Sequence, residues 1–181
     1  PGGPHVDSGG EAVETLISFR KGAEPVEVQN ATCVNGCHEK GEHTYWTGST
    51  HEVRGVACVS CHKVMESVSD RFNLAKPTAI EVCSQCHLTR RAQLQRSSHM
   101  PLREGKISCT DCHNNDEWTP TGTRPRGPHG SRYEPILERQ FQAGDPSTES
   151  FTAYALCYKC HNRTTLLEGS GRFPHKRHVV G

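Results

Sequence analysis

The sequence predicts a mainly irregular fold with a few short α-helices and little or no β-structure, and three observations predict it. First, only 33% of the 181 residues are hydrophobic and 6% are aromatic, with a mean hydropathy of −0.70, whereas an ordinary domain has about 45–50% apolar residues when Gly is counted. Second, ten Cys and 12 His accompany this shortage of apolar residues. Third, no stretch shows the alternation of a half-buried strand. A bound metal or cofactor, or a set of disulfides, must therefore supply the missing core.

Three stretches have the pattern of a helix. Residues 11–21 carry Val, Leu, Ile and Phe at positions 13, 16, 17 and 19. Residues 79–95 contain no Gly or Pro, and residues 147–167 follow Asp145 and Pro146, which resemble an N-cap and a first-turn proline. The segment 114–133 contains several Gly and Pro residues and predicts a long loop.

The cysteines form a repeated motif. Every Cys belongs to a close pair, and each pair is followed directly by His. Four pairs read Cys-x-x-Cys-His, and the first pair has one additional residue between its cysteines. This is the attachment motif of c-type haem, in which two thiols add across the porphyrin vinyl groups and the His coordinates the iron. The motifs are Cys33/Cys37/His38, Cys58/Cys61/His62, Cys83/Cys86/His87, Cys109/Cys112/His113 and Cys157/Cys160/His161.

Zinc sites and thioredoxin-like redox sites also use Cys-x-x-Cys pairs. Neither requires His after the second Cys, so five such His with no unpaired Cys favour haem over zinc or disulfides. The stretched first motif is predicted to bind haem as well, with a vestigial or zinc-bound pair as the alternative. The predicted cofactor is therefore haem c, five groups attached covalently.

The spacing of the motifs gives the domain organisation. Their first cysteines are 25, 25, 26 and 48 residues apart, which is an internal repeat. We expect an N-terminal arm or helix at residues 1–30 and a pentahaem cytochrome domain at residues 31–181. That domain has haem repeats of 25–26 residues to position 116, a loop insertion at 114–145, a last haem helix at 146–168 and a His-rich C-terminal arm at 169–181. The fold class is thus a multihaem cytochrome c with a haem-filled core.

Seven His lie outside the motifs and are candidates for the second axial ligand of each iron. They are His5, His43, His51, His99, His129, His175 and His178. Seven His for five haems favour bis-His ligation at most or all sites, with Met65 and Met100 as alternative ligands. Two His are then unligated, or one is donated to an adjacent subunit. His51 and His99 each lie in the stretch that leads into the next motif, and this recurrence favours ligation.

Four connecting segments carry a resemblance to a known family. They are residues 45–51 (Tyr-Trp-Thr-Gly-Ser-Thr-His), 90–99, 104–108 (Glu-Gly-Lys-Ile-Ser) and 128–131 (Pro-His-Gly-Ser). With the motifs, they resemble the periplasmic multihaem cytochromes related to the decahaem conduit of outer-membrane metal respiration and to the small pentahaem donor of periplasmic nitrite reduction. The resemblance implies covalent haem c, bis-His ligation, an elongated row of haems and export across the cytoplasmic membrane.

The sequence departs from that family at three places. The first motif is stretched, His99-Met100 stands where the family has tandem His, and an insertion precedes Pro128. With only five motifs present, these departures count against a porin-embedded decahaem role.

Two classes of function fit the motifs. An electron carrier or conduit needs six-coordinate irons and no substrate chemistry. A multihaem reductase of nitrite, hydroxylamine or a similar small substrate needs one iron with an open position. Because no motif replaces the proximal His by Lys and spare His are plentiful, the sequence favours a carrier and not an enzyme. It leaves open a free shuttle, a subunit of a membrane complex or a protomer of an extracellular filament.

Charge and chemistry restrict partners and location. The formal net charge of +1 becomes about −4 with five ferric haems and their propionates, so a basic nucleic-acid footprint is absent. Redox proteins, or identical or related haem subunits, are the predicted partners. No apolar stretch approaches the roughly 20 residues of a membrane span, so membrane association is expected only through a partner. Covalent haem attachment predicts a periplasmic or extracellular protein whose signal sequence has been removed.

Overall fold

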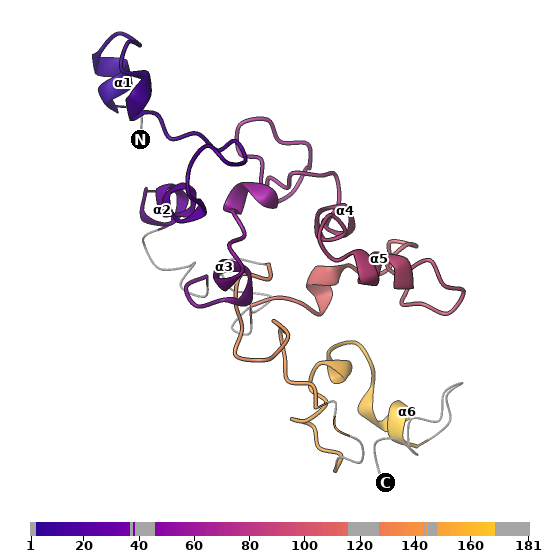
Figure 1. Cartoon of the computed structure of the whole chain (residues 1–181). Coiled ribbons are helices and arrows are strands. Elements are labelled where there is room, and N and C mark those ends of the chain that lie inside the picture. The colour runs from indigo at the N-terminus through magenta and orange to yellow at the C-terminus, as the bar shows by residue number, and fades with distance from the viewer. Residues whose placement is uncertain are drawn as a thin grey trace. The chain divides into compact units, whose positions relative to one another are not determined.

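The computed structural model describes residues 3–36, 38, 46–115, 127–142, 144 and 148–168. The chain divides into two compact units, Pro1–Cys109 and Thr110–Gly181. In each unit, short helices alternate with turns and irregular segments (Figure 1). The described residues pair only through isolated β-bridges and form no strand. The predicted fold class is confirmed.

The helices are short in both units. Those of the first unit are α1 (Gly3–Asp7), α2 (Val26–Gly36), α3 (Thr50–Val53), α4 (Ala79–Cys83) and α5 (Leu88–Gln93), with the 3₁₀ turns η1 (Val13–Thr15) and η2 (Cys58–Ser60). The 3₁₀ turn η3 (Cys109–Asp111) follows, and the second unit contains the 3₁₀ turn η4 (Cys157–Lys159) and the helix α6 (Arg163–Leu167).

Local polar side chains start these helices. The Ser49 hydroxyl accepts from the Glu52 amide at the start of α3, and the Asn162 side chain accepts from the Thr165 amide at the start of α6. Helix α4 has a complete capping box between Thr78 and its own third residue. Because helices of four or five residues are marginal without such help, these caps decide where α3, α4 and α6 begin.

The continuous helix predicted over residues 79–95 is instead two helices. Helix α4 ends at Cys83 and α5 begins at Leu88, because the third motif lies between them. The backbone of His87 has φ −84° and ψ 60°, which is not helical, and this residue precedes α5.

Within the described part of the helix predicted over residues 147–167, or 146–168 as the last haem helix, only η4 and α6 are helical. Cys160 ends η4 with φ −119°, and Asn162 is extended at φ −69° and ψ 125°, so the chain leaves the helical region between η4 and α6. In the stretch 11–21 only η1 is helical, since Leu16 is already extended at ψ 133°. Leu16 and Phe19 are 42% and 41% exposed, so no packing surface supports a longer amphipathic helix there.

The protein core is small. Among the described residues, the buried apolar side chains are Trp46, Val82, Leu137, Ala153 and Tyr154. Many larger apolar side chains are exposed, including Met65 at 93% and Met100 at 58%. Helix α2 crosses residue 30, where the sequence places the end of the N-terminal arm. None of the helices in the described ranges combines the length and apolarity needed to cross a membrane.

Candidate haem-binding sites

Four of the five motifs, namely the first, second, third and fifth, close through a backbone hydrogen bond from the motif His to the first Cys. The amide of the motif His donates to the carbonyl of the first Cys in the second, third and fifth motifs, at 2.9 to 3.0 Å. In the stretched first motif, the His38 amide donates to the Cys33 carbonyl at 3.1 Å. The additional residue therefore leaves the first Cys and the His in the same hydrogen-bonded relation. Cys37 lies outside the described residues, and whether this motif carries haem stays a prediction.

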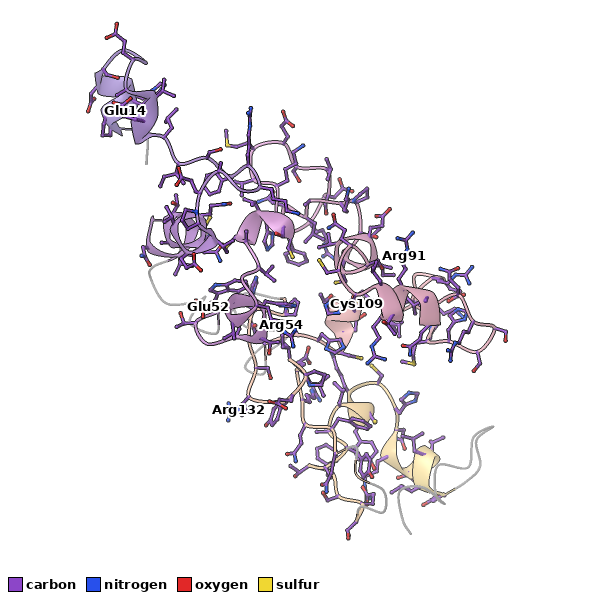
Figure 2. The ribbon with its side chains drawn as sticks, in the orientation of Figure 1. Glu14, Glu52, Arg54, Arg91, Cys109 and Arg132 are labelled. Atoms are coloured by element: carbon purple, nitrogen blue, oxygen red, sulfur yellow. The ribbon has the colours of Figure 1, made fainter. Side chains whose placement is uncertain are left out.

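Thiols of consecutive motifs lie beside one another in the first unit. The Cys33 thiol is a hydrogen-bond partner of Cys58, and burial followed by this neighbour raises the pKa of Cys58 to about 11. A hydrogen bond with Cys109 is the largest cause of a strongly raised pKa at Cys83. These two contacts join the first motif to the second and the third motif to the fourth (Figure 2 labels Cys109).

The second and third motifs are also neighbours. Burial raises the pKa of the Cys61 thiol, and the electrostatic influence of Cys86 raises it further. The cysteines described by the structure are all free thiols, as thioether formation requires. In the first unit, which contains cysteines of four motifs, each motif therefore lies beside the next motif along the chain.

A buried charged cluster joins the fourth and fifth motifs in the second unit. The Lys159 ammonium, inside the fifth motif, donates to the Asp111 carbonyl at 2.7 Å and to Glu138 Oε2 at 2.9 Å. Asn114 Nδ2 donates to the same carboxylate oxygen at 3.0 Å. The side chain of Glu138 is only 2% exposed, so this ion pair is well shielded from water.

Two motif histidines have a fixed tautomer. His62 Nδ1 lies 2.9 Å from the Phe72 carbonyl oxygen, and His113 Nδ1 lies 2.9 Å from the Pro135 carbonyl oxygen. A carbonyl can only accept, so each Nδ1 carries the proton and donates it. The lone pair of each ring is then on Nε2, the atom that coordinates a metal when Nδ1 is held in this way.

His51, a predicted distal ligand, lies opposite the third motif. Its ring, on α3, has its centre 6.3 Å from the centre of the His87 ring, with an interplanar angle of 69°. An imidazole nitrogen binds a metal at about 2 Å, and the centre of its ring lies about 1 Å further away. Two imidazoles that bind one metal from opposite sides therefore have ring centres roughly 6 Å apart. The separation matches that of two imidazoles on opposite sides of one metal ion.

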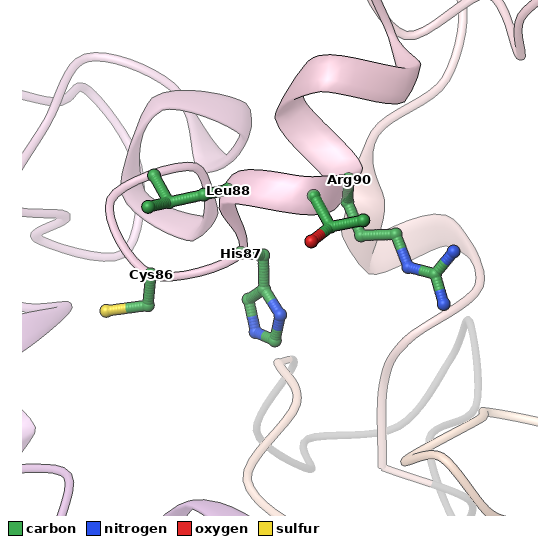
Figure 3. Close-up of a pocket in the computed structure, with 5 residues that line it drawn as sticks. Cys86, His87, Leu88 and Arg90 are labelled. Atoms are coloured by element: carbon green, nitrogen blue, oxygen red, sulfur yellow. The ribbon is translucent and has the colours of Figure 1, made fainter.

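A cavity of about 390 Å³ lies beside His87. Figure 3 shows the side chains of Cys86 and His87 on the turn that leads into α5 and that of Arg90 on α5 itself. Leu88 and Thr89 complete its lining. Thiol, imidazole, apolar and guanidinium groups are what a covalently attached haem needs for its vinyl group, iron, ring face and propionate.

The other predicted distal ligands differ in their local contacts. His99 Nε2 is 3.0 Å from Glu104 Oε1, and His99 Nδ1 is 2.5 Å from the Arg96 carbonyl oxygen. The hydrogen bond with the Glu104 carboxylate, and then the one with the Arg96 carbonyl, raise the pKa of His99. Coordination by His99 would require Nε2 to exchange Glu104 for iron. The position of the His129 ring requires glycine at residue 127. Gly127 has φ +139°, and a Cβ added there would lie 3.1 Å from the His129 ring.

The remaining candidates are less well placed or not described. His5 is on α1, and its buried Nδ1 has no hydrogen-bond partner among the described residues. His43, His175 and His178 lie outside the described ranges, and their ligation stays a prediction. In the residues that the structure covers, no group of three or more His, Cys, Asp or Glu is arranged to hold a bare metal ion.

Several functional groups were not found from the sequence. Arg90 and Glu138 are ordinary charged residues in the sequence, and nothing marks them as neighbours of a motif. Lys159 is visible as a basic residue inside a motif, but its partner Glu138 is 21 residues away. The carbonyls of Phe72 and Pro135 are backbone groups and leave no trace in residue type.

The residues present fit haem c. The thiols are free, the histidines of the second and fourth motifs present Nε2, and a cavity with a cationic side chain lies beside the third motif. A core of so few buried apolar side chains also suits a chain that packs against a large apolar ring.

Comparisons with known proteins agree with this chemistry. Residues 3–86 match the family model described as cytochrome c-type protein NrfB-like, and residues 99–166 match the model described as a doubled CXXCH motif. The multiheme cytochrome MtrA of Shewanella baltica (strain OS185) is 33% identical over 162 residues, which is 89% of this chain and 40% of that protein. The chain therefore spans about 40% of the length of the curated relative that it matches. From its motifs, its free thiols and these matches, the chain is a multihaem c-type cytochrome with covalently bound haem c, similar to the NrfB-like cytochromes and to MtrA.

Proposed function

We propose that this chain is an electron conduit of five haems arranged in the order of their motifs. The adjacency of thiols from consecutive motifs carries this proposal. Cys33 meets Cys58, Cys61 is near Cys86, and Cys83 meets Cys109. Each thiol bonds to the vinyl edge of its haem, so adjacent thiols bring the edges of two haems together. Electron tunnelling slows steeply with edge-to-edge distance, and such a row favours transfer from each haem to the next.

Within the second unit, the fourth and fifth motifs are neighbours. The pKa of Cys112 is raised first by burial, and Cys160 and Cys157 are among the charges that raise it further. Lys159 holds the backbone of Asp111 at 2.7 Å, which keeps the two motifs together. The polypeptide in this account supplies position and charge, and the haems supply the one-electron chemistry.

We also propose bis-His ligation, with His51 and His87 as the axial pair of the third haem. Their ring separation of 6.3 Å supports this pairing. The other four haems take their distal ligands from a set of six, of which two stay unligated or one is donated to an adjacent subunit: His5, His43, His99, His129, His175 and His178. Six-coordinate, low-spin irons have no position open for a substrate, so the proposed activity is electron transfer without substrate reduction.

The proposed setting is the periplasm or the cell exterior, where covalent haem attachment places such proteins. Partners are other redox proteins or identical or related haem subunits, and membrane association occurs through a partner. With a net charge of about −4 when its five haems are ferric, the protein suits a partner with a cationic docking surface.

Haem counting and spin-state analysis test this proposal on the intact protein. Intact mass and pyridine haemochrome absorbance are expected to give five haems, and EPR of the oxidised protein is expected to show low-spin signals alone. Four haems would refute attachment at Cys33 and Cys37. A high-spin signal from about one fifth of the iron would instead favour a reductase with one open haem.

A further inference from the structure

The histidines of the second and fourth motifs are held in the same way although the surrounding sequences differ. His62 Nδ1 donates to the Phe72 carbonyl, 10 residues later, at 2.9 Å. His113 Nδ1 donates to the Pro135 carbonyl, 22 residues later, also at 2.9 Å. Loops of very different length therefore return a carbonyl to the same ring atom.

A second backbone hydrogen bond repeats at each site. Three residues after the acceptor carbonyl, the Ala75 amide donates to the Cys61 carbonyl at 2.8 Å, and the Glu138 amide donates to the Cys112 carbonyl at 2.9 Å. The returning segment is thus hydrogen-bonded both to the carbonyl of the second Cys and to the His ring of its motif. We call these segments, Phe72–Ala75 and Pro135–Glu138, the carbonyl braces.

The two braces share part of their backbone path, although Phe72 has a φ of 60° and Pro135, whose ring holds φ at about −65°, cannot follow it there. Leu74 forms an antiparallel bridge with His62, and Leu137 forms one with His113. The residue before each Leu has a positive φ, 47° at Asn73 and 59° at Ile136. Asn tolerates this left-handed conformation, but a β-branched Ile adopts it only at a cost. The positive φ at Ile136 runs against its own preference and is held by its surroundings, which include the bridge between Leu137 and His113.

The third and fifth motifs are built differently. Helix α5 begins directly after His87, and α6 begins two residues after His161. In the part of the chain that the structure describes, neither of these rings donates to a backbone carbonyl. From the second motif to the fifth, the sites alternate between braced and unbraced. The pair at residues 46–95 repeats the design of the pair within 99–166, the range that matches the doubled-motif model.

The brace changes the electronic character of the ligand. When Nδ1–H donates to an acceptor, the ring becomes a stronger donor through Nε2, and a stronger donor stabilises the ferric over the ferrous iron. Hydrogen bonding around an axial ligand is one of the means by which a protein sets a haem potential. A braced haem is therefore harder to reduce than an unbraced haem in similar surroundings.

We propose that the haems at His62 and His113 have lower reduction potentials than those at His87 and His161, so that potentials alternate along the row from the second haem to the fifth. This inference rests on the proposed arrangement of haems in motif order. During reduction by dithionite, electrons go first to the haems at His87 and His161, one to each ferric iron, and only then to the two braced haems. Ala75 and Glu138 act as positioning residues through their backbone amides.

A proline substitution tests the effect on potential. Ala75→Pro removes the amide that donates to Cys61, whereas Val68→Pro places a proline in the same loop at an exposed residue outside the brace. In a spectropotentiometric titration of the full pentahaem protein, Ala75→Pro should shift one of the low-potential components upward, and Val68→Pro should leave every component in place. Unchanged potentials in an Ala75→Pro protein that keeps all its haems low-spin would overturn the proposal.

Hydrogen exchange on the unmodified protein provides a test that no folding defect can obscure. In protein labelled with ¹⁵N-His, the Nδ1 protons of His62 and His113 should exchange about fivefold more slowly than those of His87 and His161, since each brace adds roughly 1 kcal/mol of hydrogen bonding. Equal exchange at all four rings would overturn the brace itself. A wrong haem count or a high-spin iron would refute the proposed conduit and would leave the exchange comparison valid.

Discussion

At the scale of single residues, His51 offers the most direct test of axial ligation. His51→Ala should convert about one fifth of the haem iron from low-spin to high-spin, because one of five irons loses its sixth ligand. EPR and visible spectra of the oxidised protein measure this change. Val53→Ala, on the same helix and 77% exposed in the native chain, is the matched control and should leave all irons low-spin. An entirely low-spin His51→Ala protein would show that another group binds the third haem.

Loss of the buried Glu138 carboxylate should destabilise the second unit. Glu138→Ala leaves the Lys159 ammonium without the carboxylate 2.9 Å away in a buried site, and breaking a buried pair in this way costs about 3–5 kcal/mol. Denaturant unfolding followed by Soret circular dichroism measures the loss.

Two further variants give that prediction its controls. Glu134→Ala, at an exposed position four residues earlier, should change the free energy of unfolding little. Glu138→Gln keeps an acceptor for Lys159 and Asn114 and should lose less than Glu138→Ala. Equal stability of Glu138→Ala and Glu134→Ala would contradict a structural role for the cluster.

At this scale, sequence reasoning succeeds where chemistry depends on side-chain type. The motif Cys and His are readable because thioether formation and coordination require those residues at that spacing. The carbonyl acceptors at Phe72 and Pro135 are not readable, since every residue has a carbonyl. The pairing of His51 with His87 also needs the structure, because the two residues are 36 positions apart and no rule of spacing joins them.

At the scale of elements, α4 shows how a very short helix can be stable enough to present a motif. The Thr78 hydroxyl accepts from the Glu81 amide at 3.2 Å, and Glu81 Oε2 accepts from the Thr78 amide at 3.0 Å. Thr78→Ala should therefore destabilise α4 by about 1 kcal/mol and increase amide exchange over Ala79–Cys83. Ser97→Ala, at an exposed position in the same unit, should leave that exchange unchanged. Faster exchange in both variants, or in neither, would contradict the importance of the cap.

The elements were only partly predictable. Thr78 and Glu81 form a readable start signal, and the helix predicted to begin at residue 79 does begin there. Its end was missed because the predicted span to residue 95 treats Cys86 and His87 as ordinary helical residues, whereas the closing turn of the motif breaks the helix at Cys83. Apolar spacing also failed near Leu16 and Phe19, since periodicity predicts a helix only when a surface exists to bury its apolar face.

At the scale of the whole molecule, haem attachment should be a condition for folding. The buried apolar side chains of the described residues are too few to offset the conformational entropy of the chain. A variant with all ten Cys replaced by Ser should be unfolded, with a coil-like far-ultraviolet spectrum and narrow amide proton dispersion. The double variant Cys33→Ser/Cys37→Ser should lose one haem and remain folded. A cooperative unfolding transition in the haem-free chain would contradict this prediction.

The carbonyl braces have a consequence for how this protein can evolve. A point mutation at position 72 or 135 changes a side chain but leaves the carbonyl, so the acceptor is robust to substitution. Only an insertion, a deletion or a change of backbone path removes it, and the intervals of 10 and 22 residues show that loop length itself has latitude. Alternating reduction potentials that are set by backbone carbonyls can persist while the surrounding sequence changes. Related chains should therefore conserve the backbone path of the returning turn more than the residue types that form it.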